Sequence, residues 1–330
     1  MRVVVFGAGA IGAYVGASLC RAGVEVHLIA RGPQLAALRE RGVQVLSERG
    51  DFAAHPHATD DPRDIGEVDY VFLGIKAHSY ATAGALLAPL LGPQTAIVAA
   101  QNGIPWWYFH KLVGPYEGRR IETVDPGGAT SAVLSRDRAI GCVAYPATIV
   151  ESPGVIRHLE GTRFSIGEPD GTSSPRCLGF SDAMVAGGLK CPVEPRLRDD
   201  IWIKLMGNAS LNPISALTRA TMVEICRHPN TRRVVELMMA ETLDIAARLD
   251  SRPEISIAKR IDGAERVGHH KTSMLQDLEA GRELELDAIV GAVVELADMT
   301  CAEAPTLRTI YAATHLLAQS TMRSASPAVG

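Results

Sequence analysis

The segment that decides the fold is Met1–Gly12, MRVVVFGAGAIG, in which a short β-branched and aromatic run leads into three glycines spaced as GxGxxG. The segment after it, AYVGASLCRAG (13–23), places its apolar residues at helical intervals and ends in glycine. The pattern predicts a strand, a tight turn and a helix in immediate succession. This is the opening unit of an α/β nucleotide-binding fold.

The alternation of strand and helix continues for about a hundred residues. Strands are predicted for VEVHLIAR (24–31), VQVLS (43–47), VDYVFLGIK (68–76) and TAIVAAQNG (95–103), with helical segments between them. We therefore predict a Rossmann-type N-terminal domain with a doubly wound, mostly parallel sheet. Between Pro105 and about Pro195 the strands are shorter, and we expect them to complete this sheet.

Almost every segment from Arg196 onward has helical periodicity, including TRRVVELMMAETLDIAARLD (231–250) and PTLRTIYAATHLLAQ (305–319). An all-α C-terminal domain is expected there. The predicted division is 1–195 for the Rossmann-type domain and 196–330 for the helical domain. A cleft between two domains is a common place for a small ligand.

Composition excludes several classes of function. With 33 basic and 37 acidic side chains the net charge is −4, so the chain lacks the positive charge that binds nucleic acid. The six cysteines include no CxxC pair, and no metal site is expected. No leader and no membrane-spanning stretch is recognisable. We expect a soluble, cytoplasmic monomer or homodimer that acts on a small molecule.

The glycine turn predicts dinucleotide binding, because glycines let the backbone approach a pyrophosphate at the start of the helix. After the second predicted strand stands Arg31, where NAD-binding proteins carry an acid, and this favours NADP. Lys76 and Asn102 follow later strands on the same edge of the sheet. They could equally be a surface lysine and a turn residue. The cofactor-binding candidates are Gly7, Ala8, Gly9, Ala10, Ile11, Gly12, Arg31, Lys76 and Asn102.

A polar stripe interrupts the apolar segment KLMGNASLNPIS (204–215). Lys204, Asn208 and Asn212 are spaced four apart, so on a helix they would lie one above the other. A structural explanation is also open, in which Lys204 reaches solvent and Asn212 caps a new helix that begins at Pro213.

Several motifs together resemble the ketopantoate reductase (2-dehydropantoate 2-reductase) family. They are GAGAIG, the arginine after the second strand, QNG (101–103), KLMGNASLNP (204–213) and KTSMLQDLEAGRELELD (271–287), and they span both predicted domains. The resemblance implies NADPH-dependent reduction of ketopantoate to pantoate on the route to pantothenate and coenzyme A. It implies catalytic roles for Lys204 and Glu285, substrate binding by Asn208, Asn212 and Ser273, and a place near the nicotinamide for Asn102.

The chemistry of these residue types agrees with that reaction. Hydride transfer to a ketone leaves an alkoxide, and a lysine ammonium can supply both the positive charge and the proton. Glu285, expected on a helix between Leu284 and Leu286, could hold the ammonium or a substrate hydroxyl, or it could belong to an ordinary charged helix. Ser273 could instead cap the helix MLQDLE.

Three features depart from the family pattern and bear on the substrate. They are the aromatic pair Trp106 and Trp107, Tyr145 within CVAYPATIV (142–150), and Met222, where an asparagine is expected. The tryptophans could narrow the substrate pocket or simply pack on the sheet. The alternatives are a reductase of another small 2-oxo acid and an NADP(H)-binding sensor without catalysis, although the pair Lys204 and Glu285 favours a reductase.

Overall fold

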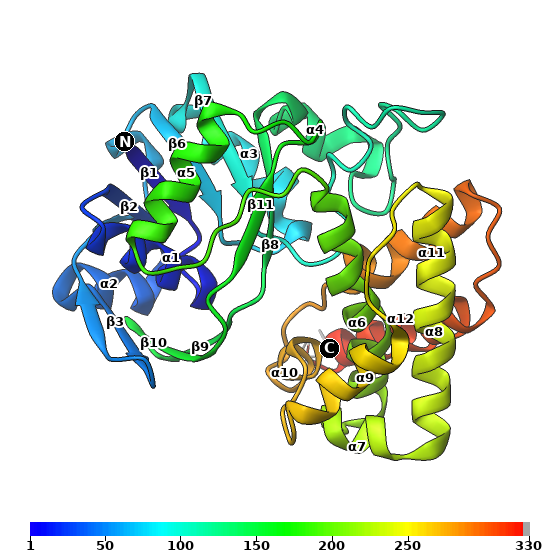
Figure 1. Ribbon diagram of the computed structural model, residues 1–330. Coiled ribbons are helices and arrows are strands. Elements are labelled where there is room, and N and C mark those ends of the chain that lie inside the picture. Colours follow the sequence, from blue (N-terminus) through cyan, green and yellow to red (C-terminus); the bar gives the residue numbers. More distant parts are fainter. Residues whose placement is uncertain (326–330) are drawn as a thin grey trace, which may run out of the picture. The chain divides into compact units, whose positions relative to one another are not determined.

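The computed structural model of the protein describes residues 1–325, which form two compact units (Figure 1). Unit 1 comprises Met1–Gln101, Trp106–Arg120 and Gly127–Leu197. Unit 2 comprises the chain from Arg198 onward together with two short segments, Asn102–Pro105 and Ile121–Pro126, which the sequence division counts with residues 1–195.

The main sheet of unit 1 has seven strands in the order β11-β8-β7-β6-β1-β2-β5. All neighbouring strands are parallel except β11, which runs antiparallel to β8. The predicted doubly wound, mostly parallel sheet is therefore confirmed. Its strands are β1 (Arg2–Phe6), β2 (Glu25–Ile29), β5 (His57–Thr59), β6 (Val68–Leu73), β7 (Leu91–Ala99), β8 (Ala139–Ala144) and β11 (Phe164–Gly167).

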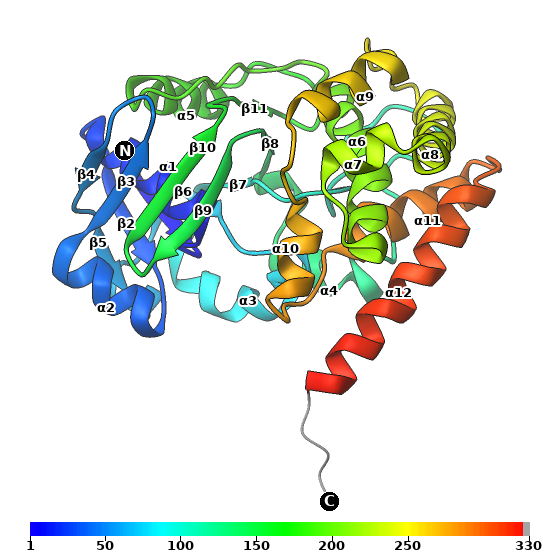
Figure 2. The same cartoon turned by 90° about the horizontal axis from the view of Figure 1, so that it is seen from below.

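A second sheet of four strands, in the order β4-β3-β10-β9, was not predicted (Figure 2). The expectation that residues 43–47 and the segment around 147–150 belong to the main sheet was wrong. The reason lies in helix α1 (Ala10–Arg21), which contacts both sheets and is buried from Gly12 to Leu19, so both sides of it need an apolar cover. The strands are β3 (Val43–Ser47), β4 (Phe52–Ala54), β9 (Ala147–Ser152) and β10 (Val155–Glu160).

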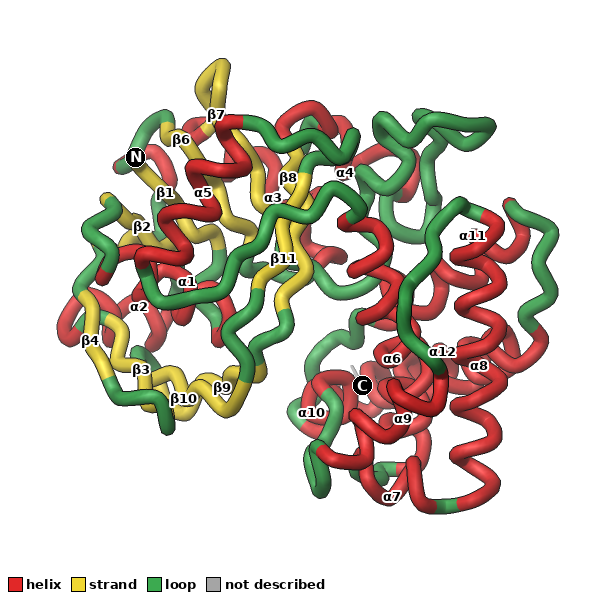
Figure 3. Tube along the Cα trace, viewed as in Figure 1, coloured by secondary structure: helices red, strands yellow, loops and turns green. Residues whose placement is uncertain are grey.

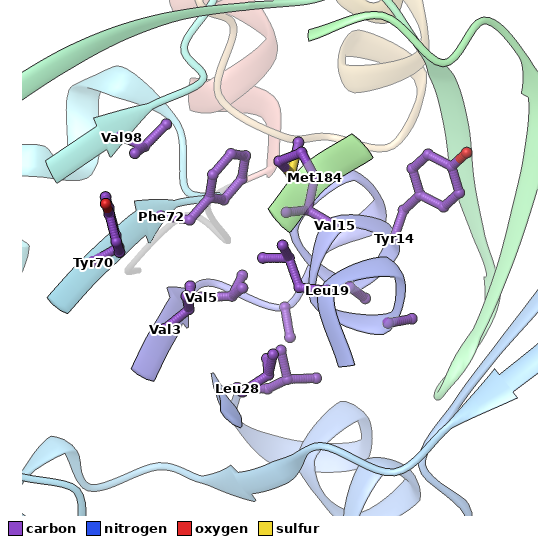
Figure 4. Packing of buried hydrophobic residues seen from close by; sticks show 14 of the residues in the cluster. Val3, Val5, Tyr14, Val15, Leu19, Leu28, Tyr70, Phe72, Val98 and Met184 are labelled. Carbon is purple, nitrogen blue, oxygen red and sulfur yellow. The ribbon is translucent and has the colours of Figure 1, made fainter. Parts of the chain in front are cut away.

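The core of unit 1 lies between the main sheet and its helices. Val5 of β1 and Phe72 of β6 are fully buried and lie close to Val15 and Leu19 of α1 (Figure 4). Met184 of α5 lies among them. The other helices of this unit are α2 (Gly32–Arg41), α3 (Tyr80–Leu87), α4 (Ala129–Val133) and α5 (Pro175–Ala186).

Trp106 and Trp107 are both buried in unit 1, with 3% and 1% of their surface exposed. The Trp106 indole N–H donates to the Leu134 carbonyl over 3.1 Å. A Cβ at Gly141 of β8 would lie 2.4 Å from the Trp107 ring, so glycine makes room for that indole on the sheet. The packing interpretation of these residues is confirmed, although they sit in a turn and not in a helix.

Unit 2 is built of helices and loops over the residues that the structure describes, as Figure 3 shows, which confirms the predicted all-α region. Within residues 1–325, no helix combines the length and the apolar character needed to cross a bilayer. The helices of this unit are α6 (Leu197–Thr218), α7 (Met222–Arg227), α8 (Pro229–Arg248), α9 (Ile257–Arg266), α10 (Ser273–Glu279), α11 (Ala292–Met299) and α12 (Pro305–Ala325).

Helix α6 runs through Pro213 without a break. Proline removes one helical hydrogen bond but has a backbone angle compatible with a helix. The interpretation of Asn212 as the cap of a new helix was therefore wrong. Lys204, Asn208 and Asn212 lie on one continuous helix, at the spacing that puts them on a common face.

Candidate active site

A pocket of about 600 Å³ opens in unit 1 at the carboxyl ends of β1 and β2. Its wall includes Gly7, Ala8 and Gly9 after β1, Arg31 after β2, and Ile75 after β6. The strand order reverses between β1 and β6, and ligands of open α/β sheets bind at such a reversal. The pocket therefore lies where a dinucleotide is expected.

The glycine turn has the geometry that its sequence predicts. Gly7 has a φ of +100°, and a Cβ at Gly12 would lie 2.1 Å from the Gly7 carbonyl oxygen, so both positions need glycine. Around Gly9, no heavy atom of the described chain lies within 4 Å of the Cβ position. Helix α1 begins after Gly9, and within the described chain no side chain caps its first amides. These amides suit a pyrophosphate oxygen.

Gln34 of α2 supports the turn and was missed by the sequence analysis. Its amide nitrogen donates to the Ala8 carbonyl over 2.9 Å, and its amide oxygen accepts from the Gly154 N–H over 2.9 Å. Gln34 thereby ties the glycine turn to the β9–β10 hairpin and also lines the pocket. A single glutamine on an amphipathic helix gives no sequence signal of such a role.

The remaining cofactor candidates include one residue of the pocket wall, Arg31, and others that the wall does not include. Arg31 is exposed and stands at the N-terminal end of α2. Lys76 is half-buried and lies in the chain between two pocket-lining residues, Ile75 and Ser79. Ala10, Ile11 and Gly12 form the first turn of α1, while Asn102 belongs to unit 2.

Unit 2 holds all the candidates for the substrate and for catalysis. On α6, Lys204 and Asn208 are half-buried and Asn212 is 5% exposed. Among residues 1–325, no group accepts a hydrogen bond from the buried Nδ2 atom of Asn212. Such an atom costs about 1–3 kcal/mol, which a ligand with an oxygen at that point would recover.

Glu285 does not lie on a helix, contrary to the expectation. It lies two residues before a π-helical turn, Asp287–Gly291, from which only Leu286 separates it. Its Oε2 atom accepts a hydrogen bond of 3.1 Å from Nδ2 of Asn102. The structure thus brings together two candidates that are 183 residues apart in the sequence.

The QNG turn is docked on the backbone of the π-helical turn. The Ile104 N–H donates to the Ala288 carbonyl over 2.9 Å. Gly103 has a φ of +84°, and a Cβ there would lie 2.0 Å from the same carbonyl oxygen. Only glycine fits this approach, and the approach aligns Asn102 with Glu285. Single π-turns of this kind are frequent at functional sites.

Tyr311 of α12 also contacts this π-helical turn. Its hydroxyl donates to Oδ1 of Asp287 over 2.8 Å. Burial, followed by this hydrogen bond, raises the pKa of the Tyr311 hydroxyl. The phenol therefore remains a donor at neutral pH and holds the segment that follows Glu285.

Ser273 is the first residue of α10 and is exposed. The cap of this helix is Thr272, whose Oγ1 accepts from the Leu275 N–H over 3.2 Å. The interpretation of Ser273 as the cap was therefore wrong. Met222, at the position of the expected asparagine, begins α7 and is half-buried.

Unit 1 has a pocket where doubly wound sheets bind dinucleotides, and unit 2 carries a lysine and two asparagines on α6. Such a combination is typical of nicotinamide-dependent oxidoreductases. Comparison with protein families agrees. The model for "Ketopantoate reductase PanE/ApbA" matches residues 3–171, and the model for its C-terminal part matches residues 196–318. The chain belongs to the ketopantoate reductase family.

Individual relatives extend over nearly the whole chain. The 2-dehydropantoate 2-reductase of Mesorhizobium japonicum is 46% identical over 319 residues, which is 96% of this chain and 98% of that protein. The crystal structure of 2-dehydropantoate 2-reductase from Geobacter metallireducens superposes with a TM-score of 0.82 at 25% identity, covering 99% and 100% of the two chains. A D-mandelate dehydrogenase solved with NADH and anilino(oxo)acetate has a TM-score of 0.80 at 18% identity, covering 97% and 99%, and shares the fold.

Proposed function

We propose that this protein reduces 2-dehydropantoate (ketopantoate) to pantoate with NADPH, on the route to pantothenate and coenzyme A. Support comes from the 46% identical relative that bears this activity in its name. The observation that carries the proposal is the polar face of α6, where the lysine and two asparagines include a buried amide that has no hydrogen-bond acceptor among the described residues. Such a face suits the oxygens of a small oxo acid.

In this proposal, one unit binds the cofactor and the other binds the substrate. The pocket of unit 1 would hold the cofactor, with pyrophosphate at the glycine turn and Arg31 at the 2′-phosphate that distinguishes NADP from NAD. The helical part, which we place from residue 196 onward, would bind the substrate. The reduced nicotinamide supplies a hydride when bound.

Lys204 is the proposed general acid. Its ammonium polarises the 2-oxo group and gives its proton to the oxygen as negative charge develops there. Asn208, Asn212 and Ser273 donate hydrogen bonds to the substrate without adding charge. Glu285, held by Asn102, accepts a hydrogen bond from the ammonium or from the substrate hydroxyl.

The test is the rate at which NADPH is oxidised with ketopantoate, for the wild-type protein and for Lys204→Ala. We expect turnover by the wild type, its loss in the variant, and an unchanged dissociation constant for NADPH. Lys259→Ala removes an exposed lysine of α9 and is the matched control. Undiminished turnover by Lys204→Ala would refute the mechanism.

Substrate and cofactor are tested on the same preparation. Faster turnover of another 2-oxo acid than of ketopantoate would reassign the substrate, and NADPH binding without turnover of any 2-oxo acid would indicate a sensor. Arg31→Ala should raise KM for NADPH and leave KM for NADH nearly unchanged, because only NADPH carries the 2′-phosphate. Equal effects on the two cofactors would contradict the assignment of Arg31.

A further inference from the structure

The glycine turn of unit 1 leaves the Gly9 amide to a ligand. The N–H groups of Gly7 and Ala8 both donate to the Ile29 carbonyl of β2, over 3.2 and 3.0 Å. The next N–H, that of Gly9, has no acceptor in the part of the chain that the structure describes. Gly9 also belongs to the wall of the 600 Å³ pocket, so its N–H is available to a bound molecule.

Gln34 fixes the direction in which this amide points. Its Nε2 atom donates to the Ala8 carbonyl over 2.9 Å, and no other donor of the described chain reaches that oxygen. The Ala8 carbonyl and the Gly9 N–H belong to one peptide group, which is planar and trans. The C=O and N–H bonds of such a group point in opposite directions. A hydrogen bond that holds the carbonyl therefore holds the N–H as well.

The second sheet holds the other end of Gln34. Its Oε1 atom accepts from the Gly154 N–H over 2.9 Å, in the turn between β9 and β10. Because one end of the amide donates and the other accepts, both contacts allow only one orientation of the side chain. A Cβ at Gly154 would lie 3.2 Å from Cβ of Ala37, so the hairpin packs closely on α2. Val150 of β9 lines the pocket, which the hairpin therefore reaches directly and through Gln34.

The direction of an amide matters for binding a phosphate. A hydrogen bond to a charged oxygen is roughly twice as strong as one between neutral groups, and it weakens steeply when the donor is misaligned. We propose that Gln34 is a positioning residue for the cofactor, which directs the Gly9 amide at the pyrophosphate and makes the second sheet part of the cofactor site. The proposal rests on the cofactor part of the proposed function.

The test compares NADPH with adenosine 2′-phosphate, which has the 2′-phosphate but no pyrophosphate. Dissociation constants are measured by titration calorimetry. For Gln34→Met we expect the dissociation constant of NADPH to rise about 10-fold, the lower end of the range for one hydrogen bond to a charged group. That of NADH should rise by the same factor, because both cofactors carry the pyrophosphate, and that of adenosine 2′-phosphate should not change.

Two other variants define the pattern. Arg31→Ala should show the reverse, with weaker binding of NADPH and of adenosine 2′-phosphate and no change for NADH. Gln44→Met removes an exposed glutamine of β3 that does not line the pocket, and it should keep the wild-type constants for all three molecules.

Gly154→Ala tests the link to the second sheet without changing Gln34. The added methyl group pushes the hairpin away from Ala37, so the acceptor end of Gln34 loses its fixed partner and the affinity for NADPH should fall. Gly23→Ala is the matched control. Gly23 has a φ of +81°, close to the +79° of Gly154, and no heavy atom of the described chain lies within 4 Å of its Cβ position. The control should lose stability but not affinity.

Wild-type affinity for NADPH in Gln34→Met would overturn the proposal, and wild-type affinity in Gly154→Ala would overturn the role of the second sheet. Weaker binding of adenosine 2′-phosphate by Gln34→Met, together with a lower melting temperature, would show a general packing role and overturn the proposal as well. If the wild type binds neither NADPH nor NADH, the cofactor part of the proposed function fails and the assignment of Gln34 fails with it. Binding without turnover would count against the proposed reaction alone.

Discussion

Substitution of Gly103 by alanine tests whether the QNG turn aligns Asn102 with Glu285, for which we propose a catalytic role. The left-handed backbone at Gly103 costs an alanine about 1–2 kcal/mol. The new Cβ would stand 2.0 Å from the Ala288 oxygen, so one of the two segments must move. That movement breaks the hydrogen bond of 2.9 Å between Ile104 and Ala288, at a further cost of about 1 kcal/mol.

The expected total is about 2–3 kcal/mol, which corresponds to a fall in melting temperature of about 3–4 °C for a chain of 330 residues. The effect on catalysis should be larger. A displacement of about 1 Å at Asn102 separates it from Glu285, and misplacement on that scale lowers kcat by about 100-fold. The assays are thermal unfolding and steady-state oxidation of NADPH with ketopantoate.

Gly268→Ala is the matched control for this substitution. Gly268 has a φ of +78° and lies in unit 2, and no heavy atom of the described chain lies within 4 Å of its Cβ position. The control should carry only the backbone strain, with kcat unchanged. If Gly103→Ala and the control behave alike in both assays, the proposed link between the turn and Glu285 is refuted.

Three further predictions follow from single contacts. Asn212→Leu should raise the melting temperature, because it removes a buried amide that has no acceptor among residues 1–325. The same substitution should raise KM for the substrate about tenfold, because the proposed hydrogen bond is lost. A lower melting temperature would contradict this reasoning. Gly9→Ala should weaken NADPH binding at an unchanged melting temperature, since its Cβ meets open space in the pocket. Gly12→Ala should lower both the affinity for NADPH and the melting temperature, because its Cβ would meet the Gly7 carbonyl. Cofactor titration measures the affinity, and thermal unfolding measures the stability. A thiol reagent at pH 8 should label exposed Cys301 first and leave Cys177 unlabelled, because burial raises the pKa of Cys177 to about 12; mass spectrometry of the labelled peptides would show the order.

The sequence predicted correctly the features that depend on residues close together in the chain. The glycine turn was predictable because its glycines are required by contacts with residues nearby in the sequence. At Gly12, for example, a Cβ would collide with the Gly7 carbonyl. The polar face of α6 was predictable from spacing alone. Its continuity through Pro213 was not, because burial of the helix on its neighbours outweighs the hydrogen bond that proline removes.

Features that depend on contacts between residues far apart in the sequence could not be predicted from local sequence patterns. The second sheet depends on pairing of β3 with β10, and neither strand signals its partner in sequence. The bond from Asn102 to Glu285 needs the approach of Gly103 to a carbonyl far along the chain. The role of Gln34 depends on the Ala8 and Gly154 backbones, which carry no side-chain signature.

The two-sided cover of α1 also has a consequence for synthesis of the chain on the ribosome. One face of α1 packs on β1 and β2, which emerge early, whereas the sheet on its other face needs β9 and β10 in addition to β3 and β4. Val155 of β10 pairs with Gln44 of β3. The Gln34 to Gly154 bond closes a loop of 120 residues. Closure of such loops is slow and entropically costly. A nascent chain that ends before residue 155 therefore lacks part of the sheet that covers its first helix, and during this interval apolar surface of that helix is available to a chaperone.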